Sequence, residues 1–108
     1  MSQTNAIILR FREAETERFE KLFEAEVLPM WVEFKRQGKF LSASLTPVAD
    51  GSEVKKGVRD YILHVEVPSM GEHEEFDSSA PFLDFLKKAQ PMQTQGAKVW
   101  LGTTLFQV

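Results

Sequence analysis

The stretch Val58-Arg-Asp-Tyr-Ile-Leu-His-Val-Glu-Val67 alternates apolar and other side chains and predicts a β-strand. Successive side chains in a strand point to opposite faces of a sheet. The odd-numbered residues from Tyr61 onward are all apolar, whereas the even-numbered ones mix Ile62 with His64 and Glu66. We therefore expect a sheet with one face covered by other elements and a second face of mixed character.

Three further segments predict strands that pair with this one. Residues 5–12, 40–48 and 97–108 each contain alternating apolar side chains. The segment Pro47 to Gly57 is rich in turn-forming and charged residues, which predicts an exposed loop whose role the sequence does not indicate. The apolar residues expected to pack under helices are Ile7, Leu9, Phe11, Leu41, Ala43, Leu45, Tyr61, Leu63 and Val65.

Between the first two predicted strands, Glu15 to Gln37 has a helical period. Apolar residues recur every three or four positions from Phe19 to Phe34, and Gly38 follows as a plausible stop. Pro29 lies within this segment, where it would cost roughly 3 kcal/mol in a regular helix. We expect a kink or a break near Leu28.

A second helical region follows the strand that ends at Val67. Ser69-Met-Gly-Glu72 has the spacing of a capping box, which predicts a helix to about Phe76. The segment Asp77-Ser-Ser-Ala-Pro81 interrupts that helix. Pro81 suits the first turn of a second helical segment that runs through Ala89.

The predicted order of elements is β-α-β-β-α-β within a single domain of residues 1–108. This order is typical of the α+β, ferredoxin-like fold, a four-stranded antiparallel sheet with two helices on one face. Ile8, Phe40 and Ile62 are expected on the opposite face, where they would expose several hundred Å² of apolar surface. We therefore expect a homodimer that covers this mixed face.

The composition excludes several classes of protein. The net charge is −3 with acids and bases interspersed, so no nucleic-acid partner is expected. The chain contains no cysteine, which excludes disulfides, thiolate metal sites and cysteine nucleophiles. No apolar run is long enough to span a membrane, and the first residues do not resemble a signal peptide. We expect a cytoplasmic protein with no membrane partner.

The chain resembles the dimeric α+β barrel superfamily, which includes antibiotic-biosynthesis-type monooxygenases, haem-degrading monooxygenases and stress-response proteins. The resemblance rests on Phe19-x3-Phe23-x3-Val27-x-Pro29 in the first helix and on Phe76-Asp-Ser-Ser-Ala-Pro-Phe82-x2-Phe85 in the second. It implies that two sheets pack face to face across a twofold axis. It also implies a small cavity, either between sheet and helices or facing the barrel. The Pro47–Gly57 loop departs from this pattern because it is longer than a tight hairpin.

The candidate catalytic residues lie on the mixed face. His64 and Glu66 are two residues apart on one strand and therefore point to the same side. Arg10, on the neighbouring strand, could hold an anionic substrate near a histidine that a carboxylate orients. The alternative is a satisfied polar network inside a dimer interface. The candidate substrate-binding residues on this face are Phe40, Ser42, Ile62 and Trp100.

No metal site is expected. His73 and Asp77 are four residues apart on the second predicted helix, and His64 with Glu66 offers another pair. Each pair supplies two ligands where a firm site needs three or four. The acidic residues around His73 are better explained as a solvated helix start that the helix dipole favours.

No haem or other cofactor is expected either. In the resembling haem-degrading enzymes, an Asn on the first strand, a later Trp and an axial His on the second helix are needed, and Asn5 and Trp100 are similar to the first two. The axial position falls near residues 85–88, which contain no histidine, and His73 comes too early in the chain.

Two hypotheses for the function remain open. The first is a non-catalytic dimer that binds a small, partly apolar molecule in a cavity. The alternative is a cofactor-independent monooxygenase that acts on an electron-rich aromatic substrate, with His64 as general base and Arg10 as the group that holds the anion.

Overall fold

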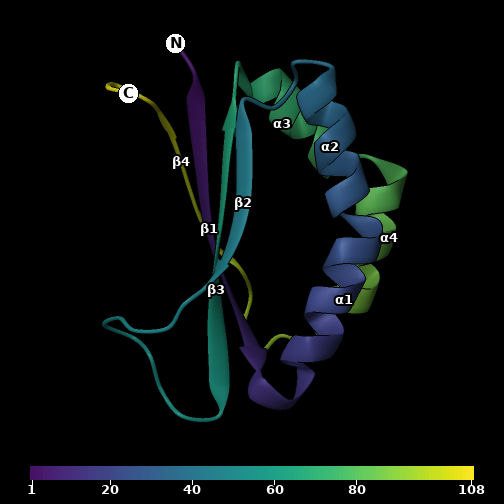
Figure 1. Cartoon of the computed structure of the whole chain (residues 1–108), viewed down its shortest axis with the longest axis vertical. Helices are drawn as coiled ribbons and strands as arrows, with labels where there is room; N and C mark the ends of the chain where they lie inside the picture. Colours follow the sequence, from purple (N-terminus) through teal and green to yellow (C-terminus); the bar gives the residue numbers. More distant parts are fainter.

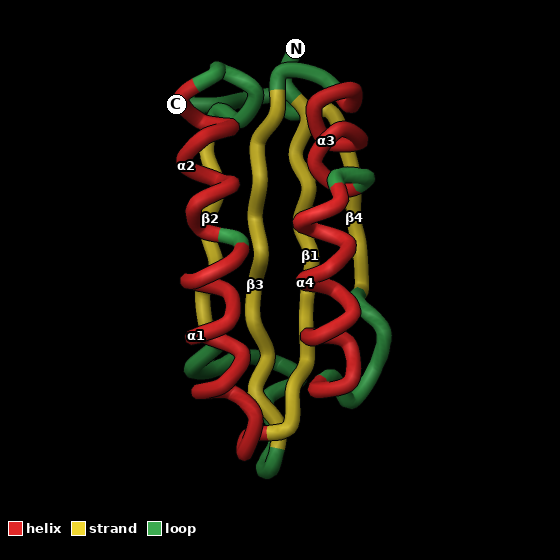
Figure 2. Tube along the Cα trace, turned by 90° about the vertical axis from the view of Figure 1, so that its right-hand side faces the viewer, coloured by secondary structure: helices red, strands yellow, loops and turns green.

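The computed structural model describes residues 1–108 and contains one antiparallel sheet whose helices all lie on the same face (Figures 1 and 2). The order of strands across the sheet is β2-β3-β1-β4. This arrangement confirms the predicted ferredoxin-like α+β fold. The strands are β1 (Gln3–Arg12), β2 (Ser42–Pro47), β3 (Val58–Val67) and β4 (Lys98–Thr103).

The first helical region is broken where the sequence predicted it. After a short 3-10 turn η1 (Glu13–Glu15), α1 (Thr16–Glu26) is followed by α2 (Leu28–Arg36), with Val27 between them. Pro29 stands at the start of α2, where its missing N–H leaves no bond unmade. The break therefore changes the direction of the helix at little energetic cost.

The second helical region is divided in the same way. It consists of α3 (Met70–Asp77), α4 (Ala80–Ala89) and the 3-10 turn η2 (Gln90–Met92). Pro81 lies in the first turn of α4, as predicted. The predicted capping box differs in detail, because the Ser69 hydroxyl donates to the Glu72 carboxylate and caps no backbone N–H.

The core lies between the sheet and the helices and is built largely from aromatic rings. Phe11 of β1 stacks on Phe19 of α1, and both contact the ring of Tyr61 from β3. The Tyr61 hydroxyl donates to the Glu20 carboxylate, and burial raises the pKa of this tyrosine. These contacts confirm that the odd-numbered residues of β1 and β3 face the helices.

One predicted face assignment is wrong, at the start of β2. Phe40 was expected on the open face, which we define as the sheet face opposite the helices, and Leu41 was expected in the core. Phe40 is 2% exposed and packs on Phe34 and Phe76, whereas Leu41 is 39% exposed. The strand begins only at Ser42. The N–H of Phe40 still donates to the Phe34 carbonyl at the end of α2, so Phe40 belongs to the helix cap and not to the alternation.

The last strand is shorter than predicted. β4 ends at Thr103, whereas the sequence predicted a strand to Val108. The neighbouring strand β1 begins at Gln3, so the ladder has no partner for residues beyond this point. Thr104 instead donates its N–H to the Ser2 carbonyl. The final residues therefore leave the sheet at its end, near the chain's first residues (Figure 1).

The loop between β2 and β3 extends away from the sheet on the side opposite the helices (Figure 1). It is attached to the sheet by Arg10, whose Nη2 donates to the Glu53 carbonyl at 2.8 Å. Lys98 of β4 lies 3.5 Å from the Glu53 carboxylate. The loop thus borders one end of the open face.

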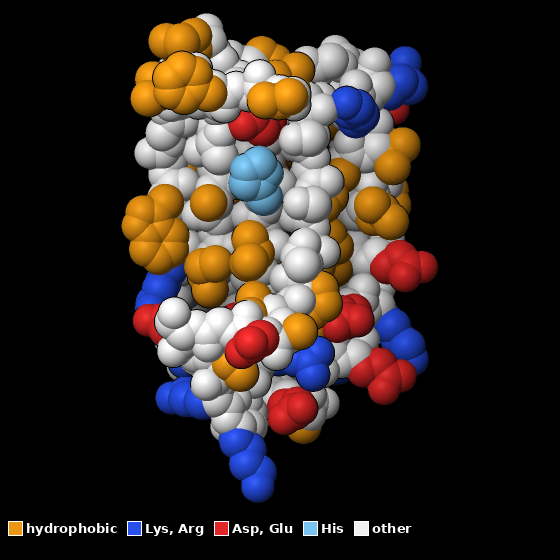
Figure 3. Space-filling view, turned by 60° about the vertical axis from the view of Figure 1, so that its left-hand side comes forward, with side chains coloured by type: hydrophobic (Ala, Val, Ile, Leu, Met, Phe, Trp, Pro, Cys, Tyr) orange, Lys and Arg blue, Asp and Glu red, His pale blue; other side chains and the backbone are white.

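The middle of the open face is covered by no other part of the chain, whereas the β2–β3 loop borders one end and Gln107 contacts Glu66 near the other. Apolar side chains gather there around one histidine (Figure 3), and strand register places Ala6, His64 and Ser44 side by side across it. Ile62 and Trp100 are exposed on this face, Trp100 at 58%. Separately, no helix is long and apolar enough to cross a membrane.

Truncation of neighbouring residues at the start of β2 tests the corrected face assignment. Phe40→Ala should lower the free energy of unfolding by roughly 3–5 kcal/mol, because it empties a packed aromatic site. Leu41→Ala should lower it by about 1 kcal/mol or less, because that side chain is already partly in solvent. Urea unfolding of both variants measures the difference. Equal losses would contradict the assignment.

Candidate functional site

A small cavity lies between the sheet and the helices. Its volume is about 40 Å³, enough for on the order of one to three water molecules. The wall is mainly apolar and aromatic, and its polar residues are Asn5, His73 and Asp77, which we call the polar triad. The main apolar lining residues are Ile7, Trp31, Phe40, Leu63, Phe76 and Phe82.

The polar triad is a continuous chain of hydrogen bonds. Asn5 is in β1, the strand flanked by β3 and β4, and His73 and Asp77 are one turn apart on α3. The Asn5 Nδ2 atom lies 2.9 Å from His73 Nδ1, and His73 Nε2 lies 3.0 Å from Asp77 Oδ2. An ionised Asp77 can only accept, so Nε2 carries a proton and, in the neutral ring, Nδ1 accepts from Asn5.

The Asn5 amide is fully buried and only half satisfied. Its Oδ1 atom is the one buried side-chain polar atom without a hydrogen-bond partner. An unmade hydrogen bond at a buried polar group costs roughly 1–3 kcal/mol. An unpaired buried polar atom on a residue that lines a cavity marks a position where a ligand or water can bind.

Asp77 connects the triad to solvent. Its side chain is 48% exposed, whereas the side chain of His73 is only 14% exposed. Burial raises the pKa of the Asp77 carboxyl, and attraction to a protonated His73 ring opposes that change. The carboxylate therefore holds the imidazole in one orientation and can stabilise its positive charge.

An open groove adjoins the cavity on the outer side of the triad. Its volume is about 590 Å³, and it lies along α3, α4 and β4, lined by Met70, Glu74, Leu83 and Leu101 among others. His73 and Asp77 line both the groove and the enclosed cavity. These two side chains thus form the partition between the cavity and solvent.

The residues predicted as catalytic do not form one site. His64 lies half-buried at the centre of the open face and makes no side-chain hydrogen bond. Glu66 shares that face, but its carboxylate accepts from other groups, and these hydrogen bonds hold its pKa below the usual range. Its donors are the side chains of Ser2, Thr4, Thr104 and Gln107. The expectation that Glu66 orients His64 is therefore not met.

Arg10 pairs with Asp60 and not with groups near His64. Its guanidinium donates to both Asp60 oxygens, at 2.6 and 2.9 Å, and this pairing lowers the pKa of Asp60. Arg10 lies opposite Asp60, and His64 lies opposite Ala6, so four residues, roughly 13 Å, separate the two along the sheet. The expectation that Arg10 reaches His64 is not met either.

The predicted substrate-binding residues are divided between two places. Ser42, Ile62 and Trp100 lie on the open face with His64, as the register of β2, β3 and β4 requires. Phe40 does not join them and lines the helix-covered cavity instead. It was assigned to the wrong side because its segment was treated as strand.

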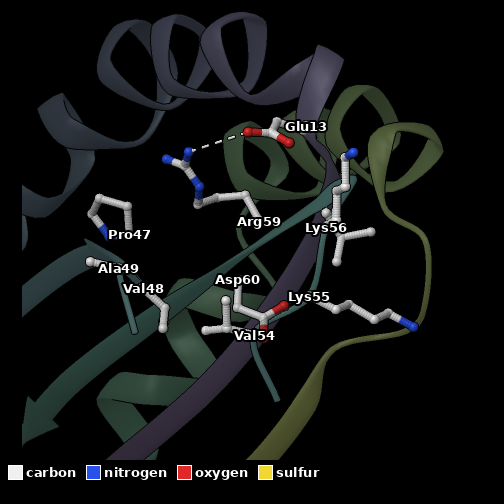
Figure 4. A pocket seen from close by; sticks show the side chains of 10 residues that line it. Glu13, Pro47, Val48, Ala49, Val54, Lys55, Lys56, Arg59 and Asp60 are labelled. Atoms are coloured by element: carbon white, nitrogen blue, oxygen red, sulfur yellow. Dashed lines mark ion pairs between the residues drawn. The ribbon is translucent and has the colours of Figure 1, made fainter. Parts of the chain in front are cut away.

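The largest hollow lies at the base of the β2–β3 loop (Figure 4) and has a volume of about 750 Å³. Among its charged lining residues, Arg59 lies 3.7 Å from Glu13 across the hollow, Asp60 is bound by Arg10 from outside the lining, and Lys55 and Lys56 form no ion pair. Lys55 extends away from the centre in this view. We assign no ligand to it.

No group of three or more His, Asp or Glu side chains converges to hold a metal ion. His73 and Asp77 do meet, as their spacing indicated, and the third member of the cluster is the Asn5 amide. The sequence analysis missed this partnership, although alternation places Asn5 on the same face as Ile7, and His73 and Asp77 share one face of α3.

Solved structures with the same fold come from several bacteria. Rv0793 of Mycobacterium tuberculosis matches with a TM-score of 0.77 and 17% identity, over 99% of this chain and 98% of that chain. SnoaB of Streptomyces nogalater, described as a cofactor-independent oxygenase, matches with a TM-score of 0.69 and 18% identity, over 99% and 96%. A protein described as an antibiotic biosynthesis monooxygenase matches with a TM-score of 0.67 and 14% identity, over 97% and 99%.

No protein-family model matches this chain, and no curated protein does. The structural matches show that this chain shares its fold with these solved structures, as the sequence resemblance predicted.

The buried carboxylate of Glu66 predicts a pH-dependent contribution to stability. Its pKa in the folded protein is lowered from the usual value of 4.5, so its stabilisation is complete above that value and is lost as pH falls through the folded pKa. Glu66→Gln should lower the free energy of unfolding by about 1–3 kcal/mol at neutral pH, and by less below about pH 4. Urea unfolding across pH measures this.

Glu24→Gln is the control, because that carboxylate is exposed and unpaired. A cost for Glu66→Gln that is the same at every pH would contradict the assigned role of the charge.

Proposed function

We propose that the cavity between sheet and helices binds a small, partly apolar molecule that carries a hydroxyl group. The observation that carries this proposal is the unpaired Oδ1 of the fully buried Asn5, on an otherwise apolar wall. A ligand hydroxyl that donates to this atom would remove the cost of the unmade hydrogen bond. Few polar groups on an apolar wall are typical of small-molecule sites.

The size of the cavity limits how such a ligand can bind. At about 40 Å³ the enclosed space is smaller than an aromatic ring system, whereas the adjoining groove is about 590 Å³. A ligand therefore places its hydroxyl at the triad and displaces wall side chains or extends into the groove. The His73 and Asp77 partition lies where such a ligand would enter.

The second candidate function is cofactor-independent oxygenation of an electron-rich phenol or anthrone. It is supported by His73, whose ring Asp77 orients and whose Nδ1 would take up the substrate proton, through water, as the Asn5 N–H leaves it. The fold shared with SnoaB also supports it. In this reaction the substrate hydroxyl gives its proton to the imidazole. The substrate anion then passes one electron to dioxygen, and the radical and superoxide combine to form the new C–O bond. The resulting peroxide anion takes the proton back from the imidazolium, and loss of water from the hydroperoxide leaves a carbonyl.

The open face supports a further part of the proposal, a homodimer. The molecule measures 39 Å along the strands and 19 Å across the sheet. That face is close in size to the roughly 800 Å² that each partner buries in a standard interface. Its exposed Ile62 and Trp100 and its half-buried His64 would then lie between two sheets.

Charge placed on the open face tests the dimer. Trp100→Glu should weaken self-association at least roughly tenfold, because a buried aromatic contact becomes an unpaired charge. Val32→Glu is the matched control, since Val32 is an exposed apolar residue on α2. Sedimentation at micromolar concentration measures the association. A wild-type protein that sediments only as a 12.4 kDa species would contradict the dimer.

Oxygen consumption separates the binder from the enzyme and compares the two histidines. The assay supplies hydroquinones and anthrones without flavin, metal or haem. If the protein is an oxygenase with His73 as base, His73→Gln should lower the rate about 10²–10⁴-fold, whereas His64→Gln should change it little. The reverse result would restore the sequence-based hypothesis that His64 is the base.

The binding proposal has its own readout. Calorimetry with the same compounds should show saturable binding that Asn5→Leu weakens, whether or not oxygen is consumed. Binding without uptake by the wild-type protein assigns a binding module. Absence of binding by every compound would count against the cavity as the site.

A further inference from the structure

Both the oxygen and the nitrogen of the Asn5 amide can form hydrogen bonds, and only one of them has a partner. One amide atom lies 2.9 Å from His73 Nδ1, and the other has no partner. A half turn about the last side-chain bond exchanges the amide oxygen and nitrogen at nearly the same positions. In either orientation, one amide atom meets the imidazole and the other is left free.

The protonation state of His73 decides which orientation is stable. A neutral ring that donates through Nε2 to Asp77 offers a lone pair at Nδ1, which the Asn5 N–H satisfies. A protonated ring donates from both nitrogens, so an N–H of Asn5 would then face another N–H. The amide oxygen is the partner that an imidazolium Nδ1–H requires.

We propose that the Asn5 amide turns when His73 gains a proton, and so converts the cavity from an acceptor site to a donor site. This proposal deepens the proposed function and rests on it for the identity of the ligand. With a neutral ring, the free Oδ1 accepts from a ligand hydroxyl. With a protonated ring, the free Nδ2 donates to a ligand oxyanion.

The turn matches the chemistry of a phenol or enol. When such a ligand loses its proton and His73 gains one at Nδ1, an O–H bond breaks and an N–H bond forms, so total charge is unchanged. The proton passes through water, because the Asn5 N–H occupies Nδ1 until the amide turns. The ligand oxygen, formerly a donor to Asn5, becomes an anion that needs a donor. The same amide supplies it, and Asp77 stabilises the imidazolium on the other side.

Apart from the protonated His73 ring, no positively charged side chain lines the cavity or the groove to stabilise a ligand oxyanion. The charged residues facing His73 are Asp77 and Glu74, both from α3. The neighbouring strands and α4 contribute apolar side chains, such as Leu63, Leu83 and Leu101, and no Lys or Arg lines the cavity or the groove. The amide of Asn5 is the uncharged donor that contacts the His73 ring directly.

The test follows both side chains in the ligand-free, ¹⁵N-labelled protein by NMR between about pH 5 and pH 8. The Asn5 amide signals should move with the same midpoint as the His73 ring nitrogens, and the contact between the Asn5 amide protons and that ring should weaken at low pH. The His64 ring serves as an internal reference. Asn5 signals that stay still while His73 titrates would overturn the proposal.

Two substitutions distinguish a turning amide from a fixed one. A fixed N–H donor opposes the imidazolium, so its removal in Asn5→Leu would raise the His73 midpoint and overturn the proposal. A turning amide stabilises both states, so Asn5→Leu should lower the midpoint or leave it unchanged. The ionised carboxylate introduced by Asn5→Asp can only accept a hydrogen bond. This substitution should therefore raise the pH midpoint of His73 by about one pH unit or more.

A visible probe tests the effect on a ligand. 4-Nitrophenol bound to the wild-type protein should ionise more readily than when it is bound to Asn5→Asp, whose carboxylate repels the phenolate. Equal ionisation in both proteins would overturn the donor role of Asn5. Failure of the probe to bind at all would count against the proposed ligand class, while the ligand-free titration still decides whether the amide turns.

Discussion

The continuous pairing of β1 with β3 is the constraint that determines on which side of the sheet Asn5 and His64 lie. Ten residue pairs run without a bulge from Gln3 opposite Val67 to Arg12 opposite Val58. Because side chains alternate along a strand, this register assigns each residue of both strands to the helix side or the open side. Asn5 is thereby placed on the helix side and His64 on the open side. Because His73 of α3 is hydrogen-bonded to Asn5, the two histidines of the chain lie on opposite sides of the sheet.

The strong periodicities were predictable because each element carries its own signal. The break at Val27 follows from the cost of Pro29 inside a helix, and the two faces of β3 follow from its alternation. The start of β2 was not predictable in this way. Phe40 continues the alternation in sequence, but its backbone is held by the end of α2, and that hydrogen bond to Phe34 is a tertiary feature.

The triad shows a different limit. Alternation alone places Asn5 among apolar neighbours, and helix geometry alone pairs His73 with Asp77. Each of these two parts of the triad could therefore be predicted from the sequence. The contact between Asn5 and His73 depends on how α3 packs over the central strands, and a local sequence pattern does not predict that packing. The open-face residues were more conspicuous because His64 and Glu66 are two residues apart on one strand. The Glu66 carboxylate, however, already accepts hydrogen bonds from side chains at both ends of the chain.

The two histidines have different surroundings, which suggests different roles for the two sides of the sheet. His64 has neighbours on β1 and β2 but makes no side-chain hydrogen bond, which suits a position between two sheets where shape and apolar area decide association. His73 is oriented on one side by a carboxylate and on the other by an amide that retains a free polar atom. Only the second arrangement holds a proton acceptor, a counter-charge and an unfilled hydrogen bond together. This contrast supports the proposals that a ligand binds on the helix side of the sheet and that self-association uses the open face.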